Sequence, residues 1–252
     1  MTTTELLLAA GCGLLGLPVG ALAVDAACRL PRDAPVWSPA RGSDGDVDGD
    51  GDVDGPPPPA QVRTLVRPPS VTAAVLTGGV LALIAAAIGA DPALPAFLYL
   101  GAVGVLLALI DLDVRRLPNA LTLPSYAVAI VLLGLAAVVE QDAGPMLRAL
   151  LGGLAMLAFY AVLALINPAG MGMGDVKLSG VLGLYLGWLG WGPLIAGAFL
   201  AFLSGAVVGL GLMVARRANR KSRIPFGPFM LLGALVAVVW GDWLVEGYAG
   251  RL

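Results

Sequence analysis

Residues 178–215 read LSGVLGLYLGWLGWGPLIAGAFLAFLSGAVVGLGLMVA, a predominantly apolar run. Its 38 residues are too many for one membrane helix, which needs ~20, and just enough for two. The residues Gly190, Trp191, Gly192 and Pro193 lie near the middle of the run and predict a turn between two helices, because Gly and Pro interrupt regular structure. The run therefore predicts a helical protein that crosses a membrane more than once.

The rest of the chain has the same character. Hydrophobic residues make up 58% of it, charged residues only 13%, and the mean hydropathy is +0.89, well above the range of soluble domains. Apolar runs fall at 5–24, 71–90, 94–110, 121–139, 146–166, 178–190, 193–215 and 226–245. We expect an all-α, polytopic membrane protein with about eight transmembrane helices, or seven if residues 178–215 form one span.

The basic residues predict the orientation, since loops rich in Lys and Arg stay in the cytoplasm. With the N-terminus outside, 13 of the 15 basic residues fall in cytoplasmic loops, and only Arg148 and Arg251 fall outside. The first apolar run is not expected to be a cleaved signal peptide, because its positive charges follow it instead of preceding it. The expected location is a multi-pass position in the plasma membrane, with the lipid bilayer as a partner.

A polar segment divides the chain. Residues 1–33 are expected to form the first transmembrane helix and its cytoplasmic end, 34–69 a disordered acidic and Pro-rich cytoplasmic linker, and 70–252 a membrane-embedded domain. The acidic tract at 44–54 is similar to a calcium loop at its start, but counting from Asp46 places Pro57 where the bidentate Glu should stand. A solvated linker explains the same residues, so no metal site is predicted.

Several functions are disfavoured by what the chain lacks. It has no histidine and only two cysteines, Cys12 and Cys28, which excludes Ser-His and Cys-His catalysis and a Cys-rich zinc cluster. No cofactor is predicted, and the low pI comes from one acidic tract, so nucleic acid is not an expected partner. If the protein is an enzyme, proton transfer must come from carboxylates, Lys or Tyr.

Three carboxylates stand out by position. Asp111 and Asp113 close the third apolar run, and Asp175 opens the sixth on the same predicted face, so distant parts of the chain bring carboxylates to one membrane depth. Asp175 could simply interact with the positive end of a helix dipole. That explanation is poor for Asp111, which would meet the negative end of a dipole beside hydrocarbon. Spacing alone does not choose between Asp111 and Asp113 as the partner of Asp175.

Two adjacent carboxyl groups can catalyse peptide hydrolysis. They share one proton, so the ionised group takes a proton from water while the protonated group donates to the peptide carbonyl oxygen. Gly170, Gly172 and Gly174 would let an extended peptide lie against Asp175, although glycines also serve close helix packing. Lys177 could lower the cost of ionising a neighbouring carboxylate, but an anchor at the membrane surface is the role we expect more.

Four stretches of the chain resemble the type IV prepilin peptidase family, membrane aspartyl proteases with a Gly-x-Gly-Asp motif. They are GLLGLPVGALAVDAACRLPR (13–32), DLDVRRLPNALTLP (111–124), GMGDVKL (172–178) and IPFGPFMLLGAL (224–235). The resemblance selects Asp111, six residues before Leu117, as the first catalytic aspartate and Asp175 as the second. It leaves Asp113 as a neighbour, with Gly172, Gly174 and Lys177 as residues that shape the site or bind substrate.

The resemblance implies an endopeptidase that removes the leader from prepilin or pseudopilin N-terminal segments at the cytoplasmic membrane face, in type IV pilus assembly or protein secretion. The chain departs from the family pattern at two places. Pro118-Asn119 stands where many members have Pro-Asp, and residues 34–69 hold none of the cysteine pairs that bind zinc in bifunctional members. Cleavage is therefore expected, whereas N-methylation of the product is unsupported.

Two other readings of the aspartates remain open. In a small proton- or cation-coupled transporter, intramembrane carboxylates carry ions, and flux would depend on Asp111 and Asp175 without any proteolysis. In an inactive pilin-assembly factor, pilin export would be insensitive to Asp175→Asn.

Overall fold

The computed structural model describes residues 7–14, 16, 70–114, 117–167, 171–215 and 225–249, without the side chains of 70, 113–114 and 241–249. The described residues fold into helices and contain no strand. Residues 7–14 are helical, and the helices that follow are α2 (Ser70–Ile88), α3 (Leu94–Val114), α4 (Asn119–Glu140), α5 (Gly144–Ile166), α6 (Met173–Leu189), α7 (Trp191–Val214) and α8 (Gly227–Ala249). The predicted linker at 34–69 lies outside the described residues.

The predicted division of residues 178–215 into two helices is confirmed. Helix α6 ends at Leu189 and α7 begins at Trp191, so a single residue, Gly190, joins them. The φ angle of Gly190 is +155°, a backbone conformation that residues other than glycine rarely adopt. Pro193 lies in the first turn of α7, where its missing N–H costs no hydrogen bond. The turn is thus shorter than the four residues expected from the sequence.

The all-α, polytopic membrane architecture is also confirmed. Among the described residues, five helices are long and apolar enough to cross a bilayer, namely α2, α3, α4, α5 and α7. Helix α6 has only 17 residues, and the part of α8 with described side chains, Gly227–Trp240, is shorter still. In the part of the chain that the structure describes, α2–α8 and the helical residues 7–14 together match the expected number of helices, whereas eight full crossings remain a prediction.

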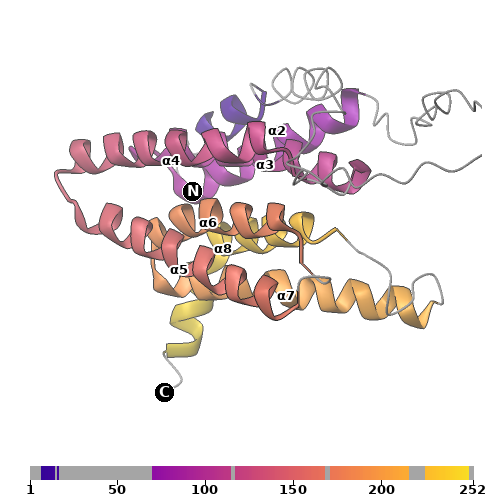
Figure 1. Ribbon diagram of the computed structural model, residues 1–252. Helices are drawn as coiled ribbons and strands as arrows, with labels where there is room; N and C mark the ends of the chain where they lie inside the picture. Colours follow the sequence, from indigo (N-terminus) through magenta and orange to yellow (C-terminus); the bar gives the residue numbers. More distant parts are fainter. Residues whose placement is uncertain are drawn as a thin grey trace, which may run out of the picture.

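Helix α6 is the centre of the bundle. Twelve of its 17 residues are buried, and it contacts α4, α5, α7 and α8. Helices α4 and α5 are antiparallel and joined by a short turn, while α2 and α3 lie together on the side away from α5 and α7 (Figure 1). Because the helices alternate in direction, the C-terminal end of α3 and the N-terminal ends of α4, α6 and α8 lie at one end of the bundle (Figure 1).

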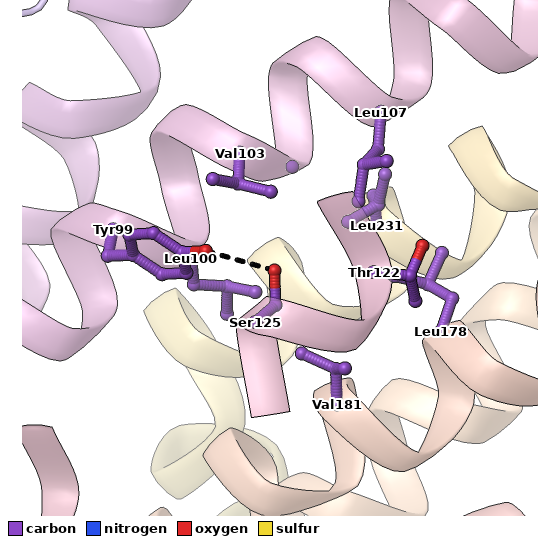
Figure 2. A pocket seen from close by; sticks show the side chains of 10 residues that line it. Tyr99, Leu100, Val103, Leu107, Thr122, Ser125, Leu178, Val181 and Leu231 are labelled. Atoms are coloured by element: carbon purple, nitrogen blue, oxygen red, sulfur yellow. Dashed lines mark hydrogen bonds between the residues drawn. The ribbon is translucent and has the colours of Figure 1, made fainter. Parts of the chain in front are cut away.

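Between α3, α4, α6 and α8, the core contains a small polar group among apolar side chains (Figure 2). The hydroxyls of Tyr99 and Ser125 are 3.1 Å apart, and that of Ser125 also donates to the Leu121 carbonyl at 2.7 Å. The side chains of Leu107, Leu178, Val181 and Leu231 surround this group. These contacts fix the first half of α3, at Tyr99, against the start of α4, at Ser125.

Arg148 has a structural role at the opposite end of α6. It donates from Nε to the Gly187 carbonyl at 2.9 Å and from Nη2 to the Trp188 carbonyl at 2.6 Å. These are carbonyls at a helix C-terminus, which have no partner inside the helix and attract a cation. The predicted orientation leaves Arg148 as an exception among the basic residues, and its bonds to α6 explain why a cation stands there.

Helices α5 and α6 approach each other closely through glycines. A Cβ atom on Gly183 would lie 2.6 Å from the carbonyl oxygen of Gly152, and one on Gly152 would lie 2.8 Å from the carbonyl oxygen of Gly183. Side chains at these positions would push the two backbones apart. Small residues at such crossings are typical of membrane helices, whose association depends on close packing.

We expect Gly183→Ala to destabilise the protein by about 1–3 kcal/mol, the usual cost of overpacking a close-packed core. Thermal unfolding of the purified protein in detergent would show this as a lower midpoint. The matched control is Gly134→Ala in α4, where a Cβ would meet no atom within 4 Å, so its midpoint should stay near that of the wild type. An unchanged midpoint for Gly183→Ala would contradict this packing.

Candidate active site

Asp111 lies in the last turn of α3 and is only 4% exposed. Its Oδ2 accepts a hydrogen bond from the backbone N–H of Gly227 at 3.1 Å. Gly227 is the first residue of α8, so its N–H has no partner inside that helix and lies at the positive end of the helix dipole. The N-terminus of α8 therefore offsets the unfavourable position of Asp111 at the C-terminus of α3.

Sequence reasoning did not identify Gly227 as a residue of the site. A Cβ atom at this position would lie 2.7 Å from Oδ2 of Asp111, so a glycine is needed for the carboxylate to approach the backbone. The preceding residue, Phe226, packs against the rings of Tyr160 and Phe202 with centroid distances of 6.3 Å and 5.2 Å. The sequence Phe-Gly-Pro at the start of the last apolar run could have marked Gly227 as unusual, but it does not indicate which residue Gly227 contacts.

Asp175 lies at the N-terminal end of α6, ahead of the apolar segment that starts at 178. The N-cap of the helix is Gly172, and Asp175 occupies the third helical position. Its Oδ2 accepts from the Gly172 N–H at 3.3 Å, and its own N–H donates to the Gly172 carbonyl at 3.1 Å. The expected favourable position at a helix N-terminus is present, with the carboxylate inside the first turn instead of at the cap.

The two carboxylates act on each other. Burial and, next to it, the negative charge of Asp111 together raise the pKa of Asp175 to about 6, while the hydrogen bond from Gly172 works in the opposite direction. Both causes of the increase disfavour the ionised form. Two residues more than sixty positions apart are therefore close enough for their charges to interact. Asp113 is helical in α3, but its side chain lies outside the described residues.

The two predicted glycines have different surroundings. Gly172 is exposed, and a Cβ there would meet Oδ2 of Asp175 at 3.4 Å and the backbone nitrogen of Gly174 at 3.9 Å, both ordinary contact distances. A Cβ on Gly174 would lie 2.9 Å from Cβ of Leu117, in the segment that leads from α3 to α4. Gly172 thus leaves space beside Asp175, whereas the space beside Gly174 is filled by Leu117. Gly170 lies outside the described residues.

Lys177 is turned toward a neighbouring helix. Its Nζ donates to Oδ1 of Asn119 at 2.9 Å, and Asn119 is the first residue of α4. The side chain therefore has a specific partner within the protein, and its expected role as an anchor at the membrane surface stays a prediction. Among the described residues, no group of three or more His, Cys, Asp or Glu side chains could hold a metal ion.

An apolar cavity of about 190 Å³ runs between α2, α3 and α8. At its end nearest the aspartates lie Ala108, one helical turn before Asp111, and Pro228, the residue after Gly227. Further along α3 it is lined by the small residues Gly101 and Gly104. Two residues of the cavity wall are thus close in sequence to Asp111 and to Gly227, which binds Asp111. The lining is apolar and matches a hydrocarbon group.

Comparisons with known proteins point to one family. A sequence model described as the type IV leader peptidase family matches residues 97–210. The chain is 35% identical over 149 residues to the prepilin leader peptidase/N-methyltransferase of Aeromonas salmonicida (strain A449), which covers 59% of this chain and 50% of the relative. It is 36% identical over 145 residues to the protein of the same description from Aeromonas hydrophila, covering 57% and 49%.

A third relative, the prepilin leader peptidase/N-methyltransferase of Pseudomonas aeruginosa (strain PAO1), is 33% identical over 145 residues, covering 56% of this chain and 48% of the relative. The matched part thus spans about half the length of these curated relatives. No solved structure matches the chain. The match to the family begins at Phe97 and ends at Leu210, so it contains Asp111 and Asp175 and stops before Gly227.

Proposed function

We propose, since residues 97–210 match the sequence model of the type IV leader peptidase family, that the chain is an aspartic endopeptidase that removes the leader from prepilin-like or pseudopilin substrates. The observation that carries the proposal is that Asp111, in the last turn of α3, and Asp175, in the first turn of α6, stand on helix ends that lie at one end of the bundle, and that the charge of Asp111 raises the pKa of Asp175. The relatives' names supply the substrate class, and the site supplies the chemistry.

In the proposed reaction the two carboxylates share one proton, because adjacent carboxyl groups do not both ionise readily. The ionised carboxylate takes a proton from water, whose oxygen attacks the peptide carbonyl carbon while the protonated carboxyl donates to the carbonyl oxygen. A tetrahedral intermediate forms and then collapses as the leaving nitrogen takes up a proton. Exposed Gly172 provides the side from which a peptide backbone can approach Asp175.

The substrate's apolar segment is proposed to lie along the cavity between α2, α3 and α8. The cavity starts beside Ala108 and Pro228, and its lining residues are apolar, so a hydrophobic helix that follows the scissile bond finds a matching surface. The scissile bond would then lie beside Asp111. In the orientation expected from the basic residues, this end of the bundle faces the cytoplasm, where a basic leader would remain.

The proposal covers cleavage and does not extend to methyl transfer. The relatives' names include an N-methyltransferase, but residues 34–69, where the resemblance leads us to expect zinc-binding cysteine pairs in bifunctional members, contain no cysteine. The mass of the new N-terminus reports on this second activity directly.

The experiment that tests the proposal is co-expression with a prepilin from the same genome. We expect a mobility shift and an N-terminal mass that correspond to loss of the leader. If wild type leaves every prepilin of the genome uncut, the peptidase is overturned. Ion flux that depends on Asp111 and Asp175 would then support a transporter, and pilin export that is insensitive to Asp175→Asn would support an inactive assembly factor.

A further inference from the structure

Two hydrogen bonds join the start of α6 to the start of α4, and both involve Lys177. Its Nζ donates to Oδ1 of Asn119 at 2.9 Å, and its backbone carbonyl accepts from the hydroxyl of Tyr126 at 2.6 Å. Asn119 and Tyr126 lie in the first two turns of α4. A single residue of α6 is thus held to α4 through both its side chain and its backbone.

Lysine is an unfavourable residue at this position if packing alone is considered. It lies in the first two turns of α6, where the positive end of the helix dipole disfavours a cation. Its partner is a neutral amide, so no ion pair compensates for the partial loss of water around the ammonium group. A charge-assisted hydrogen bond to Asn119 is the interaction that keeps the side chain in place, and it fixes direction as well as distance.

The residues beside this bond lead to Asp175 on one side and to the segment that follows α3, the helix of Asp111, on the other. Asp175 precedes Lys177 by two residues in the same helical turn, and Leu117 precedes Asn119 by two residues in the segment that follows α3. Leu117 in turn fills the space beside Gly174. The segments 117–119 and 174–177 are therefore in contact at both ends, through Leu117 and Gly174 and through Asn119 and Lys177.

We propose that Lys177 and Asn119 form a positioning clamp that sets the carboxylate of Asp175 relative to that of Asp111. The inference rests on the proposed peptidase function. Lys177 acts through Asn119 and the helix start, so it is a positioning residue, and it does not exchange protons with the substrate. Asn119 suits this role without an acidic side chain, since its amide oxygen is the acceptor that the ammonium group needs.

The test is a double-mutant cycle on the full chain in detergent, with kcat and KM measured for a purified prepilin. Lys177→Met and Asn119→Leu should each lower kcat by about 10- to 100-fold, as expected for a small displacement of a catalytic group, with little change in KM. The double variant should be no worse than the worse single variant, because both substitutions remove the same bond. Asn119→Asp keeps an acceptor and should retain activity.

Additive losses in the double variant, or a rise in KM with unchanged kcat, would overturn the clamp and assign Lys177 to an independent role such as substrate binding. If a single variant fails to fold, the double variant is the one to measure, because it removes the partly buried donor and acceptor together. A lower kcat with unchanged KM in the double variant supports the clamp, and a wild-type kcat overturns it. A wild type that cuts no prepilin overturns the proposed function, and this inference with it. A wild type that cuts while Lys177→Met and Asn119→Leu cut equally well overturns the inference alone.

Discussion

Asp111→Asn and Asp175→Asn are each expected to lower the rate of prepilin cleavage by about a thousandfold or more, because an amide can neither accept nor deliver the shared proton. The fold should survive both changes. The side-chain oxygen of an asparagine at 111 can still accept from the N–H of Gly227, and the same holds at 175 for the N–H of Gly172. The measurement is the initial cleavage rate of a purified prepilin, with thermal unfolding of each variant beside it.

Asp113→Asn is the matched control for this prediction. It makes the same chemical change two residues further along α3, and positions two apart do not share a face of a helix. Its rate should stay near that of the wild type. Loss of cleavage in Asp113→Asn with normal cleavage in Asp111→Asn would transfer the first catalytic role to Asp113, and normal cleavage in Asp175→Asn would remove the carboxylate pair from the mechanism.

Much of the fold could be predicted from the sequence because membrane helices can be recognised by their length and apolar composition. The run at 121–139 becomes Asn119–Glu140, and the run at 226–245 becomes Gly227–Ala249. Gly190 could be identified as a boundary because its two neighbouring runs were each close to the length of one span. Length and apolar composition are local properties of the sequence. A bilayer constrains both, because each spanning segment must form its own backbone hydrogen bonds as a helix.

The contacts between helices could not be predicted in the same way. The bond from Gly227 to Asp111 joins residues 116 positions apart, and the bond from Lys177 to Asn119 joins residues 58 positions apart. Hydropathy gives no direction for a side chain when a helix is apolar all round, as α2, α3 and α6 are. The sequence therefore indicated which residues carry charge at the membrane edge, but not which backbone or side chain each one meets.

Glycine illustrates the same limit at the site. Gly172 and Gly174 belong to one motif and share one expected use, yet one is exposed beside Asp175 and the other is packed against Leu117. A glycine in the sequence indicates that another group can approach the backbone closely. The identity of that group depends on the neighbouring segment in the fold, which only the structure shows. For Gly227, the close neighbour is the carboxylate of Asp111 itself.

Gly227→Ala is accordingly expected to lower the cleavage rate by about a hundredfold, an effect comparable to that of misplacing a catalytic group by roughly 1 Å. The added methyl group would lie 2.7 Å from Oδ2 of Asp111, closer than real Cβ contacts allow. Asp111 is almost fully buried at the end of α3, so its carboxylate has little free space into which it can turn. Displacement would also weaken the hydrogen bond from the N-terminus of α8, which stabilises the ionised carboxylate.

Gly211→Ala provides the comparison, because a Cβ at that position of α7 would meet no atom within 4 Å. Both variants replace a glycine by alanine in a helix, so a general effect of the substitution would appear equally in the two. We expect Gly211→Ala to cleave prepilin at the wild-type rate and Gly227→Ala to keep its thermal stability more nearly than its activity. Equal rates for the two variants would show that the N-terminus of α8 is not part of the catalytic site, and that Asp111 is held in place by α3 alone.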